Sequence, residues 1–392
     1  MTKIILLKNI LKMKNIVGQT PRGEDFFPRD KIIDRIYRRI ESNSDLFLSA
    51  PRRAGKTSIM RFLEDNPKEG YAFVYLTVED ADDTEQYFKI LSEELINNPI
   101  VGNLVKAKDK AKSIFAAFAD NIKKIKIASF EIETQKVATK YSEEFEKLVR
   151  NLDTEGSKII LMIDEFPVAL EAIAKKSGVD AGVHFLHLNR NIRQVANKNI
   201  VFIYTGSIGL PNVTRRMNAT ATVNDLNVLE VPPLTNEEGE ALVRTLFKTY
   251  NVHFEEEIVD FILERLNWLM PFFIQLVVQM LIDDYESEAK PLTKLDVNRV
   301  LDKASNHRNN IYFDSYYSRL DKTLPNEEST IAKSILSDIA VKNAVFKDKI
   351  DKKHQNVLEV LEYDGYISLS KDGFYRFNSP ILQLWWRKYA TH

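Results

Sequence analysis

One stretch of the sequence, Ser49-Ala50-Pro51-Arg52-Arg53-Ala54-Gly55-Lys56-Thr57-Ser58, constrains the fold more than any other. It follows the phosphate-binding loop pattern G-x-x-x-x-G-K-[ST], except that Ala50 occupies the first glycine position. Residues 45–49 before it, with three apolar residues at 46–48, predict a buried strand, and residues 58–63 after it have helical spacing. Strand, loop and helix is the order in which backbone N–H groups and a helix N-terminus bind phosphates.

Each part of this stretch has an expected role. We expect the Lys56 ammonium to reach the β- and γ-phosphates and the Thr57 hydroxyl to bind Mg²⁺. The remaining residues of the nucleotide-binding loop are Ala50, Pro51, Arg52, Arg53, Ala54, Gly55 and Ser58. The alternative is an ordinary basic turn between a strand and a helix.

Two carboxylates follow a second apolar run. Residues 159–163 are all apolar and lead directly into Asp164 and Glu165, which predicts a central parallel strand. Ligands of open α/β sheets bind at the carboxyl ends of such strands. We expect Asp164 to bind Mg²⁺ and Glu165 to orient or deprotonate the attacking water. A strand that ends at a polar turn is the alternative for this motif alone.

A third apolar run, residues 199–204, ends in Thr205-Gly206-Ser207. Either hydroxyl is a candidate to hydrogen-bond the γ-phosphate or the attacking water, and a plain turn is the alternative. We place Ser207 in the catalytic set with Glu165 and Lys56. Arg215 and Arg216 are candidate arginine fingers for a neighbouring subunit, with surface arginines as the more common alternative.

Composition limits the other classes of function. The 392 residues carry a net charge of −1, so the chain has no global nucleic-acid signature. The absence of cysteine excludes disulfides, thiol nucleophiles and cysteine zinc sites, and suits a reducing cytoplasm. No apolar run in residues 1–17 is long enough to span a bilayer. His184 and His187 lie one helical turn apart without a third ligand nearby, which favours a solvated helix face over a metal site.

Alternating strands and helices predict an α/β fold, a parallel sheet flanked by helices over residues 26–231, after an N-terminal extension at 1–25. Residues 100–138 are interpreted as an insertion. Within it, residues 105–126 hold seven lysines and two aspartates, and residues 126–133 are predicted to be extended. The lysines indicate either a contact surface for nucleic acid or a partner, or a solvated helix face, which is the more common case.

The sequence predicts two largely helical parts in the second half of the chain. Thr235 to Glu238 predicts a capping box and Pro271 a helix start, which indicates a helical lid over residues 232–320. Residues 321–392 show the order helix, helix, hairpin of a winged-helix domain. Such modules often bind DNA, but residues 326–392 hold ten Lys and Arg against nine Asp and Glu. Docking of a protein, or covering of the nucleotide site, is at least as consistent with that balance.

Together these motifs resemble the archaeal-type P-loop ATPase family, part of the wider AAA+/STAND group related to origin-recognition initiator ATPases. The resemblance covers about residues 20–390, and the matching segments are residues 50–58, 161–165, 204–207, 232–235, 270–273, 377–382 and 385–386. It implies an ATPase core, a helical lid and a winged-helix domain. It also implies a first sensor at Thr205 to Ser207 and a second near Pro271. The chain departs from the family pattern at Ala50 and at Met270, and no sensor arginine stands beside Pro271.

The resulting hypothesis is a Mg²⁺-dependent ATPase that forms ADP and phosphate and acts as a nucleotide-controlled conformational switch in the cytoplasm. Two alternatives stay open. One is a DNA-binding regulator in which ATP is mainly a structural ligand, and the other is a non-hydrolysing protein-interaction scaffold. We expect ATP and Mg²⁺ as ligands and an unidentified protein as partner. DNA is a weaker candidate, an oligomer is an open option, and no membrane is expected.

Overall fold

The computed structural model describes residues 13–106, 108–131, 140–306 and 310–391. The chain divides into two compact units. We call the first the sheet unit, which consists of residues 29–49 and 59–231. The helical unit gathers three separate stretches, residues 1–28, 50–58 and 232–392. The phosphate-loop residues therefore group with the C-terminal half of the sequence.

A five-stranded parallel sheet forms the centre of the sheet unit. The strands are β1 (Leu46–Ser49), β2 (Tyr71–Thr77), β3 (Lys158–Asp164), β4 (Ile200–Thr205) and β5 (Asn227–Glu230). Their order is β2-β3-β4-β1-β5, and every neighbouring pair is parallel. The apolar runs therefore form the predicted strands, and β3 and β4 are buried along almost their whole length. Since the strands are parallel, the carboxyl ends of β1, β3 and β4 share one edge of the sheet.

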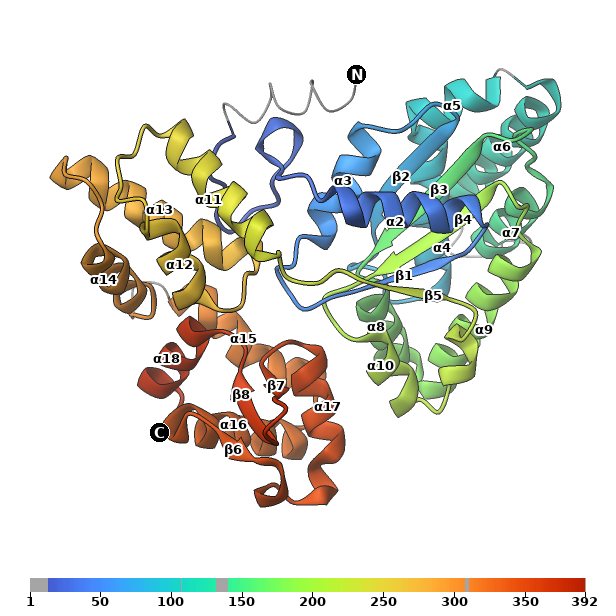
Figure 1. Ribbon diagram of the computed structural model, residues 1–392. Helices are drawn as coiled ribbons and strands as arrows, with labels where there is room; N and C mark the ends of the chain where they lie inside the picture. The colour runs from blue at the N-terminus through green and yellow to red at the C-terminus, as the bar shows by residue number, and fades with distance from the viewer. Residues whose placement is uncertain (1–12, 107, 132–139, 307–309, 392) are drawn as a thin grey trace. The chain divides into compact units, whose positions relative to one another are not determined.

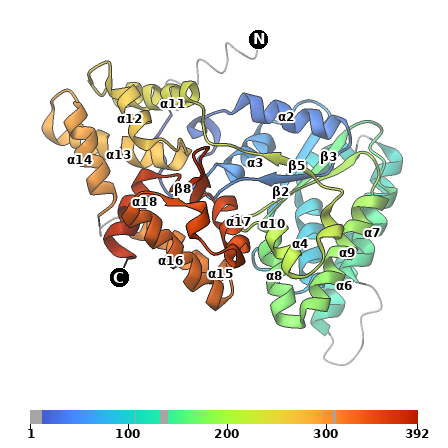
Figure 2. The ribbon, with the colours of Figure 1, turned by 60° about the horizontal axis from the view of Figure 1, so that its bottom comes forward.

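Helices cover both faces of this sheet. Figures 1 and 2 show α2 (Asp30–Glu41) on one face and α8 (Phe166–Ser177) with α9 (Val179–Val195) on the other. The remaining helices of the region are α3 (Lys56–Asp65), α4 (Thr84–Asn97), α5 (Pro99–Lys106), α6 (Asp109–Glu131), α7 (Tyr141–Asn151) and α10 (Leu210–Arg216). The apolar stripe of α2 is buried as its spacing predicts. The parallel sheet flanked by helices confirms the predicted fold class.

One prediction in the insertion is wrong. Lys126 to Glu131 are helical and complete α6, whereas residues 132–133 lie outside the described residues. Phe118, Ile122 and Ile125 are buried at helical spacing, so this pattern and not strand alternation fits the segment. Ile127 is 57% exposed.

The lysines of the insertion lie mainly at the surface. Those at 106, 110, 112, 123, 124 and 126 are exposed on α5 and α6. Lys126 forms an exposed ion pair with Glu93, at 3.0 Å. This arrangement has the form of a solvated helix face.

The largest stretch of the helical unit, residues 232–392, begins with a capped helix and includes a small sheet. Its helices are α11 (Asn236–Thr249), α12 (Ile258–Leu266), α13 (Pro271–Glu288), α14 (Lys294–Ala304), α15 (Asn310–Thr323), α16 (Asn326–Lys342), α17 (Gln355–Tyr363) and α18 (Pro380–Tyr389). Both halves of the predicted capping box are present at Thr235 and Glu238. Strands β6 (Val345–Phe346), β7 (Ile367–Leu369) and β8 (Phe374–Phe377) form an antiparallel sheet in the order β6-β8-β7. The hairpin lies where it is predicted, and the assignment as a winged helix stays a prediction.

In the part of the chain that the structure describes, no helix has both the length and the apolarity needed to cross a membrane.

Candidate functional site

The phosphate loop connects β1 to α3, and its backbone explains the departure from the loop pattern. Ala50 is buried and lies outside the left-handed region, so its backbone conformation does not require glycine. Gly55 has φ +89° and needs the freedom of glycine. Arg53, with φ +67°, is a left-handed residue that is not glycine. Left-handed residues at alternate positions are typical of backbone turns that present N–H groups to anions.

The loop lysine lies against the loop itself. Lys56 is the first residue of α3 and is only 8% exposed. Its ammonium donates hydrogen bonds to the carbonyl of Ala50 at 2.8 Å and to that of Pro51 at 3.2 Å. These bonds hold the positive charge of the ammonium at the loop backbone. Thr57 and Ser58 follow in the first turn of α3.

The two loop arginines contact α13 and α15. The guanidinium carbon of Arg53 lies 3.8 Å from the ring centre of Phe272 and 5.4 Å from that of Tyr316. Arg52 and Arg53 each donate to Ser315, at 3.4 Å to its carbonyl and its hydroxyl respectively. The sequence does not reveal these contacts, although Phe272 directly follows Pro271 in the segment that the family resemblance singles out.

Asp164 is held by a partner that the motif does not include. The phenol of Tyr75 on β2 donates to Oδ2 of Asp164 at 3.0 Å, and the backbone N–H of Glu165 donates to Oδ1 at 3.0 Å. Asp164 is 5% exposed. Burial, followed by the charge of Asp164, raises the pKa of Tyr75, so the phenol stays protonated and remains a donor.

Tyr75 is itself fixed by α3. The guanidinium of Arg61 lies 3.6 Å from the ring centre of Tyr75 and donates to Glu64 at 2.8 Å. The other oxygen of Glu64 accepts the backbone N–H of Tyr75 at 3.2 Å. A chain of contacts thus runs from α3 to the carboxylate at the end of β3. In the parallel register of β2 and β3, Tyr75 pairs with Met162, two residues before Asp164. This register brings Tyr75 near the Asp164 carboxylate.

The structure brings Glu165 and Ser207 together. Oε2 of Glu165 accepts hydrogen bonds from both the backbone N–H and the hydroxyl of Ser207, each at 2.8 Å. Glu165 has φ +60°, which turns the chain from β3 into α8. Thr205 is fully buried and its hydroxyl donates to the Leu48 carbonyl at 3.2 Å. Of the two candidate hydroxyls, Ser207 is therefore the one beside the carboxylate.

Gly206 lies between these two residues because no side chain fits there. A Cβ atom at this position would lie 2.5 Å from Cδ of Pro167 and 3.5 Å from Oε2 of Glu165. The close approach allows the end of β4 to reach the first turn of α8. A glycine within the predicted Thr-Gly-Ser strand end is the only sequence signal for this contact.

The remaining candidates lie in ordinary surroundings. Arg216 forms an ion pair with Glu171. Arg215 lies exposed at the end of α10. The histidines at 184 and 187 are exposed on α9, as the helix-face interpretation predicts. Among the described residues, no group of three or more His, Cys, Asp or Glu could hold a metal ion.

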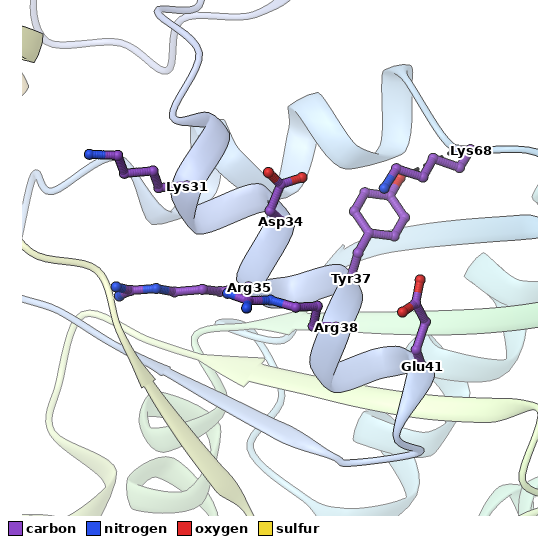
Figure 3. A pocket seen from close by; sticks show the side chains of 7 residues that line it. All are labelled: Lys31, Asp34, Arg35, Tyr37, Arg38, Glu41 and Lys68. Carbon is purple, nitrogen blue, oxygen red and sulfur yellow. Dashed lines mark hydrogen bonds between the residues drawn. The ribbon is translucent and has the colours of Figure 1, made fainter.

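A hollow of about 480 Å³ lies elsewhere in the sheet unit, along α2 (Figure 3). Its lining residues are Lys31, Asp34, Arg35, Tyr37, Arg38, Glu41 and Lys68. The Lys68 ammonium lies 3.9 Å from the ring centre of Tyr37. None of the predicted site residues lines this hollow.

Comparisons with solved structures show which fold the chain has. No family model matches the chain, and no curated protein matches it significantly. The chain resembles the Walker-type ATPase PABY2304 of Pyrococcus abyssi, with 17% identity, 95% of this chain and 99% of that chain covered, and a TM-score of 0.63. It also resembles the ORC2 protein of Aeropyrum pernix in its ADPNP–ADP complexes, with 13% identity, 93% and 94% covered, and a TM-score of 0.52. The chain therefore has the fold of the ORC-like P-loop ATPases.

Proposed function

We propose that this protein binds ATP with Mg²⁺ and hydrolyses it. The observation that supports this most is the loop after β1, where the Lys56 ammonium is anchored on two loop carbonyls at the N-terminus of α3. The backbone N–H groups of that helix end and the lysine are the groups that recognise phosphates.

Two residues of the proposed site, Thr57 and Asp164, carry oxygen atoms suited to Mg²⁺. Mg²⁺ prefers one or two carboxylates or hydroxyls together with substrate phosphates and water, so it does not require an all-protein cage. Asp164 supplies a carboxylate whose orientation Tyr75 fixes, and Thr57 supplies the hydroxyl. The donor set therefore fits the ion, which would neutralise charge on the phosphates.

Glu165 is the proposed base for the attacking water. Its carboxylate is held on one oxygen by Ser207, and an oriented carboxylate can accept the proton of a water as the water attacks. Ser207 acts as the residue that positions this carboxylate. The nucleotide state would then set the conformation of the helical unit, since the loop residues belong to that unit.

The proposal is tested by measuring binding of a fluorescent ATP analogue and release of phosphate, with Mg²⁺ and with EDTA. The wild-type protein should bind the analogue and release phosphate only with Mg²⁺. Lys56→Ala should weaken binding by about 100-fold, because it removes a charge-assisted contact with the phosphates. Equal binding by the wild type and Lys56→Ala would contradict the role of the loop.

A further inference from the structure

We propose that Arg53 is a positioning residue that holds the phosphate loop in its binding conformation by lying on an aromatic shelf. The shelf consists of Phe272 on α13 and Tyr312 and Tyr316 on α15. This inference rests on the proposed function, because it concerns how the same loop acquires its affinity for ATP.

The backbone of Arg53 is strained. A left-handed conformation costs an L-residue with a Cβ atom an amount that corresponds to about tenfold in an equilibrium constant. Arg53 nevertheless has φ +67°, two positions before Gly55. Such conformations persist only where the surrounding structure holds them in place. The contacts of the Arg53 side chain are therefore expected to hold this conformation.

Those contacts are mainly aromatic. The guanidinium carbon lies 3.8 Å, 5.4 Å and 5.9 Å from the ring centres of Phe272, Tyr316 and Tyr312. Its hydrogen bond to the Ser315 hydroxyl is long, at 3.4 Å. Nη1 is buried and has no hydrogen-bond partner among the described residues. Ring faces, and not hydrogen bonds, account for the placement of this cation, and a desolvated cation–π contact is strong enough to offset the backbone cost.

Two of the three shelf residues belong to the core of the helical unit. Phe272 is 7% exposed and Tyr316 1% exposed. The rings of Phe272 and Tyr312 meet edge to face with their centres 5.6 Å apart. The carbonyl of Tyr316 accepts the phenol of Tyr366 at 2.7 Å. An arginine lying on these rings is therefore held by side chains of α13 and α15.

The loop approaches the same region at a second point. A Cβ atom at Gly365, at the turn after α17, would lie 2.8 Å from Cβ of Pro51 and 2.8 Å from the ring of Trp268. Pro51 supplies one of the two carbonyls that hold the Lys56 ammonium. The geometry thus links the lysine, the loop backbone and the C-terminal part of the helical unit through neighbouring contacts.

The test separates the strain at position 53 from the side chain that relieves it. Arg53→Ala keeps the strain and removes the contact, so affinity for the fluorescent ATP analogue should fall about tenfold. Arg53→Gly removes both the strain and the contact, so it should bind the analogue several-fold more tightly than Arg53→Ala does. Phe272→Leu should weaken binding in the wild-type background and have no further effect in Arg53→Gly. Arg376→Ala, a matched control, removes an arginine that lies 5.3 Å from the Phe374 ring centre, and should change nothing.

A readout without nucleotide keeps this test independent of the proposed function. The melting temperature of the nucleotide-free protein should be lower for Arg53→Ala than for Arg53→Gly. If the wild type fails to bind ATP while this order of melting temperatures holds, the proposed function falls and the positioning role stands. The positioning role is overturned if Arg53→Gly binds as weakly as Arg53→Ala, if neither variant differs from the wild type, or if Phe272→Leu acts equally in both backgrounds.

Discussion

Two left-handed residues that are not glycine, Arg53 in the loop after β1 and Glu165 directly after β3, are held in different ways. Glu165 has φ +60° and is fixed by two hydrogen bonds from Ser207, a residue of its own sheet unit. Arg53 has φ +67° and is placed by aromatic rings of α13 and α15. Both positions store a backbone cost of about 1–2 kcal/mol, and each uses a different kind of contact to offset it.

The contacts of Glu165 and those of Arg53 depend on different parts of the chain. The contacts of Glu165 lie between adjacent strand ends of one sheet, so they exist whenever that sheet is folded. The contacts of Arg53 depend on helices that come more than two hundred residues later in the sequence. We therefore expect the position of the Glu165 carboxylate to be independent of the helical unit. The affinity of the loop for ATP should depend on that unit.

Glu165→Gly should have the largest effect. It relieves the same kind of strain as Arg53→Gly but removes the proposed base, so phosphate release should fall about 10³-fold while ATP binding is retained. The unfolding free energy should stay within about 1 kcal/mol of the wild type, because strain relief offsets the lost hydrogen bonds. Phosphate release and denaturant unfolding measure the two effects, with Glu165→Gln as the control that keeps the side-chain shape. Undiminished turnover would exclude Glu165 as the base.

Asp364→Asn tests whether a change in the helical unit, outside the phosphate loop, alters the affinity for ATP. Asp364 and Arg319 form a buried ion pair at 3.1 Å, with side chains 5% and 8% exposed, and Arg319 lies on α15 one turn from the shelf residue Tyr316. Removing one partner should lower the unfolding free energy by about 3 kcal/mol. KM for ATP should rise while kcat stays near the wild-type value. Asp372→Asn, at an exposed ion pair with Arg376, is the matched control and should leave both constants unchanged. A fall confined to kcat would contradict the division between the two regions.

Gly206→Ala should disturb the surroundings of Glu165 and leave the phosphate loop unchanged. The new methyl group would meet Pro167 at 2.5 Å, which costs about 2 kcal/mol of unfolding free energy and displaces Glu165. We expect about tenfold slower phosphate release with unchanged affinity for the ATP analogue. Gly102→Ala is the control, because nothing lies within 4 Å of a Cβ atom at that helical position. It should stabilise the protein by about 0.5 kcal/mol. Loss of ATP affinity in Gly206→Ala would show that the two regions are not separable.

Tyr75→Phe should give the smallest change. It removes one hydrogen bond to the Asp164 carboxylate, worth about 1 kcal/mol, so half-saturation by Mg²⁺ should need about fivefold more of the ion. Titration of phosphate release with Mg²⁺ measures this shift. Tyr389→Phe, at an exposed position near the end of α18, is a suitable control. An unchanged Mg²⁺ dependence would remove Tyr75 from the account of the metal ligand.

Local signals predicted most of the fold. The apolar runs before Asp164 and Thr205 predicted β3 and β4, and the capping box at Thr235 predicted the start of α11. These features depend on residues that are near in sequence. The prediction failed at Lys126 to Glu131, where a short alternating stretch could be interpreted either as a strand or as the last turns of a helix.

For the candidate site, the sequence predicted the motif residues but not what holds them. Ser207 could be chosen as a candidate because it ends a strand, yet its bonds to Glu165 needed the order of strands in the sheet. Tyr75 looks like any aromatic residue of a strand, and Phe272 like any apolar residue after a helix-starting proline. Their roles come from contacts through space, which no local pattern encodes.

The division of the helical unit into three stretches has a consequence for biosynthesis. Residues 29–49 and 59–231 can assemble the sheet unit as soon as they leave the ribosome, since domains fold as units and N-terminal ones first. The loop at 50–58 has to wait, because its neighbours in the helical unit begin at residue 232. If the aromatic shelf holds Arg53 as we propose, a nascent chain acquires tight ATP binding only after α15 has been translated. Nucleotide affinity would then report that synthesis has passed that point.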